Sequence, residues 1–181
     1  MMNKVLITGG SGFIGTNLIE KLLQYDDITL LNIDIAEPKI ERHRKVWHNV
    51  DVRNGERLKE VIMDFQPDYV IHLAARTDLN GKELQDYDAN LQGVCNLLDV
   101  LEQVPNLKQA VFASSMYVCE PGYMPKDFED YAPHTLYGES KVETERRIKE
   151  RDSKYTWSII RPTSIWDHGL GNPTINFSIL F

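Results

Sequence analysis

The stretch VLITGGSGFIGTNL, Val5–Leu18, places four glycines between an apolar run and an amphipathic segment. The run Lys4–Thr8 is apolar almost throughout, as a strand covered on both faces would be. The segment that follows, Phe13–Leu23, has the periodicity of a helix. Its apolar stripe consists of Ile14, Leu18, Ile19 and Leu22. The stretch therefore predicts a strand, a glycine turn and a helix in direct succession.

Counted from Gly10 the glycines match G-x-G-x-x-G, and counted from Gly9 they match G-x-x-G-x-x-G. Gly9 or Gly10 allows the tight turn, Gly12 lets backbone amides approach a pyrophosphate, and Gly15 lets the helix pack closely on the sheet. The start of the helix offers unpaired N–H groups and a partial positive charge to phosphates. The alternative is a tight turn with no ligand. Because a strand and a helix flank the glycines, we expect a dinucleotide site with contacts from Gly9, Gly12, Phe13, Ile14 and Gly15.

An aspartate ends the second strand candidate, at the place where such sites recognise a ribose. Asp34 lies 19 residues beyond Gly15, and a carboxylate there accepts both ribose hydroxyls of NAD and repels a 2′-phosphate. Asp34 could also be an ordinary strand-ending residue. Three basic residues leave a case for NADP: Lys39, Arg42 and Arg44. We expect NAD.

Strand candidates alternate with helix candidates along the rest of the chain. The predicted strands are Lys4–Thr8, Ile28–Asp34, Asp68–Ala75, Lys108–Ser114 and Tyr155–Pro162. The predicted helices are Phe13–Leu23, Gly55–Gln66, Asn90–Val104 and Leu136–Glu150. This alternation predicts an α/β fold with a doubly wound parallel sheet of the Rossmann type. The basic cluster Glu41–Lys45 is interpreted as a solvated loop.

Composition narrows the functional classes. A net charge of −7 over 181 residues argues against a nucleic-acid binder, which would carry a basic stripe. No apolar stretch approaches the length of a membrane span, and the N-terminus enters a strand directly, without a signal peptide. Cys95 and Cys119 are expected to be buried free thiols, and the five histidines lack metal-site spacing. We therefore expect a cytoplasmic protein with no metal, nucleic-acid or membrane partner.

The sequence LYGESKVE, Leu136–Glu143, contains a tyrosine four residues before a lysine. On a helix, Tyr137 and Lys141 would emerge one above the other on the same face. In a chain with 8 Tyr, such a pair also arises by chance. Its meaning depends on the other motifs of the chain.

Several motifs in one order resemble the extended short-chain dehydrogenase/reductases, and specifically the NAD-dependent epimerase/dehydratase family that modifies nucleotide-activated sugars. TGGSGFIG resembles the opening turn of the family, and YGESK its Tyr-x-x-x-Lys. The remaining matches are DVRN (Asp51–Asn54), HLAA (His72–Ala75), NLQG (Asn90–Gly93), FASS (Phe112–Ser115) and RPTSIW (Arg161–Trp166). The resemblance implies cofactor contacts from Asp51, Val52, Leu73, Ala74, Ala75, Asn90, Tyr137, Lys141 and Arg161.

The resemblance also implies a catalytic role for Ser115, Tyr137 and Lys141. A sugar hydroxyl must lose a proton as hydride leaves the same carbon, and Tyr137 would be the general acid/base. A free tyrosine has a pKa of about 10, so about 3 units of lowering are needed for it to act near neutral pH. Lys141 and the positive nicotinamide are the expected sources, Lys141 also holds the nicotinamide ribose, and Ser115 hydrogen-bonds the reacting hydroxyl. Ser114 competes with Ser115 if the register slips by one.

The chain departs from the family pattern at several places. Met116 and Tyr117 stand where the dehydratases carry an Asp-Glu pair, so elimination of water lacks its acid and base. Ser164 replaces the usual Asn, IWDHG (Ile165–Gly169) replaces a Val-Tyr-Gly-Pro run, and Cys119 replaces a tyrosine. These changes affect the expected substrate contacts.

The organisation we expect is an NAD-binding domain over residues 1–170 and the start of a substrate lobe over residues 171–181. The apolar end NPTINFSILF, Asn172–Phe181, suggests that the natural protein continues. The function we expect is that of a nucleotide-sugar epimerase or reductase. The alternatives are a non-catalytic NAD-binding protein without its substrate lobe and a reductase of a non-sugar carbonyl. The resemblance further implies a homodimer, although VETERRIKE is charged enough to be merely solvated.

Overall fold

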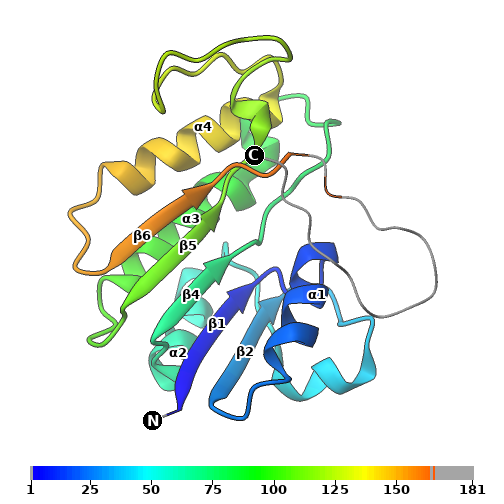
Figure 1. Cartoon of the computed structure of the whole chain (residues 1–181), viewed down its shortest axis with the longest axis vertical. Helices are drawn as coiled ribbons and strands as arrows, with labels where there is room; N and C mark the ends of the chain where they lie inside the picture. The colour runs from blue at the N-terminus through cyan, green and yellow to red at the C-terminus, as the bar shows by residue number, and fades with distance from the viewer. Residues whose placement is uncertain (1, 164, 166–181) are drawn as a thin grey trace.

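The computed structural model describes residues 2–163 and 165, and they form one α/β unit (Figure 1). Within these residues the strands are β1 (Asn3–Thr8), β2 (Ile28–Asp34), β3 (Trp47–Asn49), β4 (Tyr69–His72), β5 (Gln109–Ala113) and β6 (Thr156–Ile160). The α-helices are α1 (Phe13–Leu22), α2 (Gly55–Phe65), α3 (Asp88–Leu101) and α4 (Leu136–Lys149). Short 3-10 helices are η1 (Glu41–Val46), η2 (Leu84–Tyr87) and η3 (Met116–Val118).

The strands form a six-stranded sheet in the order β3-β2-β1-β4-β5-β6, and every pairing in it is parallel. The predicted doubly wound parallel sheet is therefore confirmed. Figure 1 shows α2, α3 and α4 behind the sheet and α1 in front of it. Because neighbouring strands are parallel, each connection returns the chain to the end of the sheet at which the strands begin. The carboxyl ends of the strands therefore all lie together at the opposite end of the sheet.

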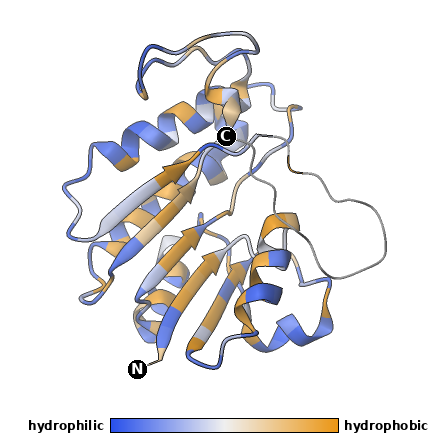
Figure 2. Cartoon of the chain, in the orientation of Figure 1, coloured by the Kyte–Doolittle hydropathy of each residue, from blue (hydrophilic) through white to orange (hydrophobic). Residues whose placement is uncertain are grey.

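Alternation along β1 gives the sheet two apolar faces. Leu6 belongs to the larger core, between the sheet and helices α2, α3 and α4. Val5 and Ile7 belong to a smaller core with Ile19 of α1. Figure 2 shows the strands as the most hydrophobic elements. Each fully buried side chain of this kind contributes about 1.5–3 kcal/mol relative to an exposed one.

Local signals set the helix ends. The side chain of Asn54 accepts a hydrogen bond from Arg57 N at 3.1 Å and so caps the start of α2. The helix ends at Gln66, which has a positive φ of 52°, before Pro67. Thr135 caps α4 in the same way by accepting from Gly138 N at 3.0 Å. This cap fixes the start of α4 and so the position of Tyr137, the second residue of the helix.

The structure differs from the sequence interpretation at three places. The strand β3 was not predicted, because WHN has only three residues and carries no clear period. The basic cluster was interpreted as a solvated loop, yet it forms η1 and buries His43, whose ring pairs with Glu20 of α1. The free thiols Cys95 and Cys119 are half-buried rather than fully buried.

Candidate active site

A cleft of about 910 Å³ opens at the carboxyl ends of the strands. The strand order reverses there, because β1 lies between β2 and β4. Open α/β sheets bind their ligands at such a reversal. The segments that follow all six strands contribute to the lining, represented in strand order by Gly12, Ala36, Val52, Ala75, Ser115 and Pro162.

The glycine turn after β1 is fixed by the sheet beneath it. Gly9 has a φ of 75°, and a Cβ on it would lie 2.5 Å from Ala74 N. Gly10 N donates to Asn32 Oδ1 at 2.9 Å, and a Cβ on Gly10 would lie 2.3 Å from that oxygen. The sequence left Gly9 and Gly10 as alternatives for the tight turn. The positive φ assigns it to Gly9.

The start of α1 faces the cleft. Gly12 is the N-cap of this helix, and Phe13, Ile14 and Gly15 of the first turn also line the cleft. N–H groups of a first helical turn have no intrahelical partners. A Cβ on Gly15 would lie 2.4 Å from Gly10 Cα, so the helix start can approach the turn only with glycine there. The turn therefore presents backbone donors at close range, as a pyrophosphate requires.

Asp34 lies at the rim of the cleft beside this turn. Its Oδ2 accepts from Ser11 N and its Oδ1 from Ala36 N, both at 2.9 Å. A carboxylate offers about four acceptor sites, so each oxygen keeps capacity for one ribose hydroxyl. Two of the basic residues that favoured NADP are engaged elsewhere. Arg42 donates to Glu20 and Arg44 to Glu37.

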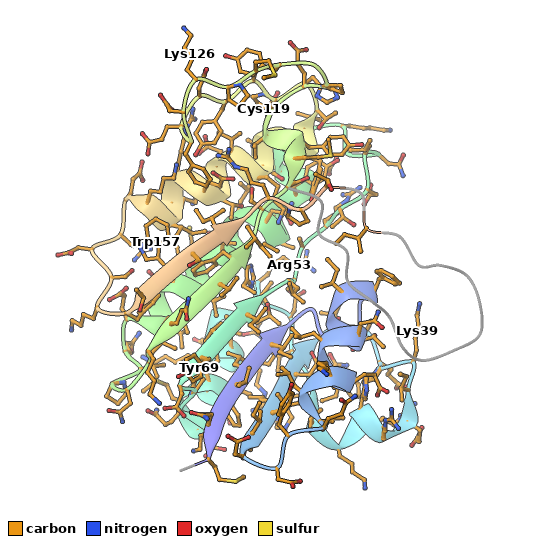
Figure 3. The ribbon with its side chains drawn as sticks, in the orientation of Figure 1. Lys39, Arg53, Tyr69, Cys119, Lys126 and Trp157 are labelled. Atoms are coloured by element: carbon orange, nitrogen blue, oxygen red, sulfur yellow. The ribbon has the colours of Figure 1, made fainter. Side chains whose placement is uncertain are left out.

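The segment after β3 forms the next part of the lining. Asp51 and Val52 line the cleft. Arg53 lies beside them, labelled in Figure 3, and its guanidinium binds the Asp51 carboxylate at 2.6–3.0 Å. The Arg53 hydrogen bond holds the pKa of Asp51 below its usual value, so the carboxylate is charged at neutral pH.

The other expected cofactor residues divide into two groups. Leu73, Ala74 and Ala75 line the cleft directly. Asn90 lies behind it, where its Oδ1 accepts from Arg76 N at 2.8 Å and its Nδ2 donates to Arg76 O at 3.0 Å. Asn90 thus shapes the loop after β4. The side chain of Arg161 binds the buried carboxylate of Glu145 and is not part of the lining, which instead includes the following Pro162 and Thr163.

Ser115, Tyr137 and Lys141 meet on the side of the cleft formed by β5 and α4. Tyr137 and Lys141 are buried one turn apart on α4, and the Ser115 side chain lies close enough to Tyr137 to lower its pKa. Lys141 Nζ donates to Ala113 O at 2.9 Å. Ser114 has a different partner, because its hydroxyl donates to Glu145 Oε1 at 2.6 Å. The geometry therefore favours Ser115 over Ser114 as the serine of the site.

Burial moves the pKa values of the two titrating groups in opposite directions, and both shifts favour the neutral form. Burial raises the pKa of Tyr137, and the nearby Ser115 side chain only partly offsets this. Burial lowers the pKa of Lys141 to about 8, against the opposing charge of Glu145. In the chain alone the net effect raises the Tyr137 pKa, so the lowering that base catalysis needs requires a further positive charge in the cleft in addition to Lys141.

A buried histidine lies beneath this centre. Thr8 Oγ1 and His72 Nδ1 are 2.6 Å apart, and burial together with nearby Lys141 lowers the pKa of His72 to about 3. His72 is therefore neutral and supports the floor of the cleft. Among residues 2–163 and 165, no three His, Cys, Asp or Glu side chains gather as a metal site.

Sequence reasoning missed several lining residues. Most of them lie shortly after a strand end, namely Ile35, Ala36, Arg76, Thr77 and Thr163, whereas Asp86 belongs to η2 and Ala89 to the start of α3. The departures at Ser164 and at residues 166–169, and the apolar end, lie outside the described residues. Ile165 alone of that run is described, and it lines the cleft.

The fold and the cleft define a Rossmann-type protein with a glycine turn for a dinucleotide and a Ser–Tyr–Lys cluster opposite it. A sequence profile of the NAD dependent epimerase/dehydratase family matches residues 5–166. The chain belongs to this family.

Two relatives are similar over most of this chain. A putative UDP-glucose 4-epimerase of Methanocaldococcus jannaschii is 31% identical, over 90% of this chain and 56% of its own length. The N-acetyl-alpha-D-glucosaminyl-diphospho-ditrans,octacis-undecaprenol 4-epimerase of Escherichia coli is 32% identical, over 92% of this chain and 50% of its own. The chain thus spans about half the length of the curated relatives it matches.

A solved structure of an epimerase is similar to this chain in fold. The UDP-glucose 4-epimerase of Thermus thermophilus in complex with NAD superimposes with a TM-score of 0.72 and 27% identity. The match covers 87% of this chain and 54% of that one. In the part of this chain that the structure describes, no helix has the length and apolar character to cross a membrane.

Proposed function

We propose that this chain is the cofactor lobe of an NAD-dependent enzyme that epimerises or reduces a nucleotide sugar. The observation that carries the proposal is the meeting of Ser115, Tyr137 and Lys141 in the same cleft as the glycine turn and Asp34. The two 4-epimerases and the NAD complex reported above support it. We assign residues 1–170 to the NAD-binding domain and residues 171–181 to the start of a substrate lobe, and we place the protein in a reducing cytoplasm.

The described residues fit a dinucleotide. The close contacts of Gly9 and Gly15 leave no room for a side chain, so the backbone itself forms the phosphate cradle. Asp34 would hold the adenosine ribose, and Asp51 and Val52 would contact the adenine. Small side chains at Ala74 and Ala75 leave space along the cleft towards Lys141. The dinucleotide, when bound, supplies the centre that accepts and returns a hydride.

The role of Tyr137 follows from its position. Its hydroxyl lies beside Ser115, so both groups can hydrogen-bond one substrate hydroxyl, and Tyr137 can take the proton of that hydroxyl and return it. Ser115 orients the hydroxyl, and Lys141 holds the nicotinamide ribose. The sequence departures at Met116 and Tyr117 favour epimerisation or reduction over the elimination of water.

Turnover on a panel of UDP-, GDP- and dTDP-sugars tests the proposal. The chain extended to the length of its relatives should convert at least one member with NAD. The 181-residue chain itself should bind cofactor with little or no turnover, because a substrate must be oriented from both sides. Cofactor binding with no turnover in the extended chain would favour a non-catalytic protein. Turnover confined to non-sugar carbonyls would favour a simple reductase.

We expect the chain to bind NADH more tightly than NADPH, because Asp34 accepts ribose hydroxyls and repels a 2′-phosphate. Replacing Asp34 by Ser removes charged hydrogen bonds worth about 1.5–3 kcal/mol each, so NADH affinity should fall about tenfold or more. Titration of cofactor fluorescence measures both affinities. Asp26→Ser is the matched control, since Asp26 is exposed and outside the lining. Tighter NADPH binding by the unaltered chain would contradict the assignment of Asp34.

We expect a homodimer in which α3 and α4 pair with their copies as a four-helix bundle. These helices pack side by side on one face of the sheet, which brings their outer surfaces together (Figure 1). Light scattering at micromolar concentration should give twice the mass of one chain. A clean monomer there would count against this arrangement.

A further inference from the structure

The carboxylate of Glu145 is fully buried at the side of the catalytic cluster, yet the proposed mechanism leaves it without a role. It lies on α4 one turn beyond Lys141, so both side chains share a helix face. Ser114 Oγ donates to its Oε1 at 2.6 Å, and Tyr131 Oη donates to its Oε2 at 2.9 Å. A buried carboxylate needs such partners to remain charged.

Arg161 provides the main counter-charge. Its Nε donates to Glu145 Oε1 at 2.8 Å and its Nη2 to Glu145 Oε2 at 2.7 Å, which is the bidentate geometry of a strong pair. Nη2 also donates to Phe128 O at 2.6 Å, and the guanidinium lies 4.0 Å from the centre of the Phe128 ring. The Arg161 guanidinium and the Glu145 carboxylate are therefore each held in one orientation.

The cluster joins four segments of the chain at one carboxylate. Ser114 belongs to the end of β5, Arg161 to the end of β6, and Tyr131 and Phe128 to the loop between η3 and α4. This loop carries Cys119 and Lys126, which Figure 3 shows above α4. Glu145 belongs to α4 itself. Because Ser114 is the neighbour of Ser115, the position of the catalytic serine depends on the same carboxylate.

Glu145 also determines the charge around Lys141. Burial raises the pKa of Glu145, but Arg161, Ser114 and Tyr131 more than reverse this, so the carboxylate is ionised at neutral pH. The other groups that face Lys141 are Tyr137 on the same helix, neutral His72 on β4 and the carbonyl of Ala113 at the end of β5. Glu145 is the one stable negative charge among these described neighbours.

We propose that Glu145, clamped by Arg161, is a positioning residue of the catalytic centre. It ties the Ser114–Ser115 strand end to α4, and it presents a fixed negative charge to the ammonium of Lys141. The role of Glu145 in catalysis rests on the proposed function. The effect of the Glu145 charge on the protonation of Lys141 does not depend on that function, so the two claims can be tested separately.

The test is the titration of Lys141 by NMR in the chain labelled with carbon-13 at the lysine side chains. The Lys141 signal is assigned by its loss in Lys141→Ala. In the unaltered chain we expect a midpoint near pH 8, in line with the pKa of about 8 that burial gives Lys141. In Glu145→Gln the negative charge that stabilises the Lys141 ammonium is lost. The titration midpoint of Lys141 should therefore fall by about one pH unit or more.

Two controls separate the charge from general disturbance of α4. Glu143→Gln removes a half-buried carboxylate of the same helix that pairs with Arg146, and the midpoint should not move. Tyr131→Phe removes one hydrogen bond to Glu145 but leaves its charge, and again the midpoint should stay. If Glu145→Gln loses the spectrum of a folded protein, Arg161→Gln decides instead. Arg161 is the main partner that keeps the buried Glu145 carboxylate charged, so its loss should protonate Glu145 and lower the Lys141 midpoint as Glu145→Gln does.

An unchanged midpoint in folded Glu145→Gln would overturn the inference, and so would an equal change in Glu143→Gln. In the extended chain, Glu145→Gln should lower kcat at least tenfold while the affinity for NAD stays within a factor of a few. A shifted Lys141 titration with no turnover by the unaltered extended chain would refute the proposed function and leave this inference standing.

Discussion

Replacing Tyr137 by Phe should abolish turnover in the extended chain while leaving the affinity for NAD nearly intact. The change removes the hydroxyl that moves the proton and keeps the ring, which packs against Tyr87 and Tyr117 at centroid distances of 6.1 and 5.8 Å. General acid/base catalysis contributes about 10²–10⁴ in rate, so the loss should be at least that large. Steady-state kinetics and a cofactor titration on the same preparation measure both quantities.

Tyr69→Phe is the matched control for this variant. Tyr69 lies on β4, labelled in Figure 3, where Lys108 approaches its ring to 5.3 Å. It is not part of the lining of the cleft, so its rate should be that of the unaltered enzyme. A Tyr137→Phe enzyme with half the original rate would reduce Tyr137 and Lys141 to neighbours on a helix face.

Replacing Lys141 by Ala should damage binding and turnover together. The ammonium is buried, donates to Ala113 O and lies one turn from Tyr137, so it can hold a ribose and bias the phenol at once. We expect at least a tenfold loss of NAD affinity, because hydrogen bonds from charged groups are worth about 1.5–3 kcal/mol. The loss of turnover should exceed the loss of affinity, since the phenol also loses a nearby positive charge.

Lys149→Ala provides the comparison on the same helix. Lys149 donates to Tyr131 Oη at 2.9 Å and pairs with Glu129, outside the cleft. It should leave both NAD affinity and turnover unchanged. If Lys141→Ala bound NAD as tightly as the unaltered chain, the cofactor could not lie against Lys141 as we propose.

The sequence was sufficient to predict the parallel sheet and the turn after β1, because each depends on local pattern. Apolar runs mark buried strands wherever they occur, and Gly9 sits where a side chain would meet the backbone of Ala74. The strand β3 was not predictable in this way. It has three residues and is fixed by its pairing with β2 rather than by its own composition.

The cluster of Ser115, Tyr137 and Lys141 was predictable in outline but not in its connections. The Tyr137–Lys141 spacing on a helix gives their shared face, whereas the choice between Ser114 and Ser115 depends on which way each side chain turns at the end of β5. The Glu145 cluster was not foreseen. Its partners are 14 to 31 residues away along the chain, and no local pattern links them. Arg161 was assigned to the cofactor for the same reason, because nothing in its own segment reveals a buried carboxylate.

Saturation-transfer NMR of NAD with the 181-residue chain tests most directly whether one dinucleotide spans the cleft from Asp34 to Tyr137. We predict saturation of both the adenine and the nicotinamide protons. In Lys141→Ala the nicotinamide signals should fall while the adenine signals persist at saturating cofactor. Saturation confined to the adenine end in the unaltered chain, or no saturation at all, would contradict the account.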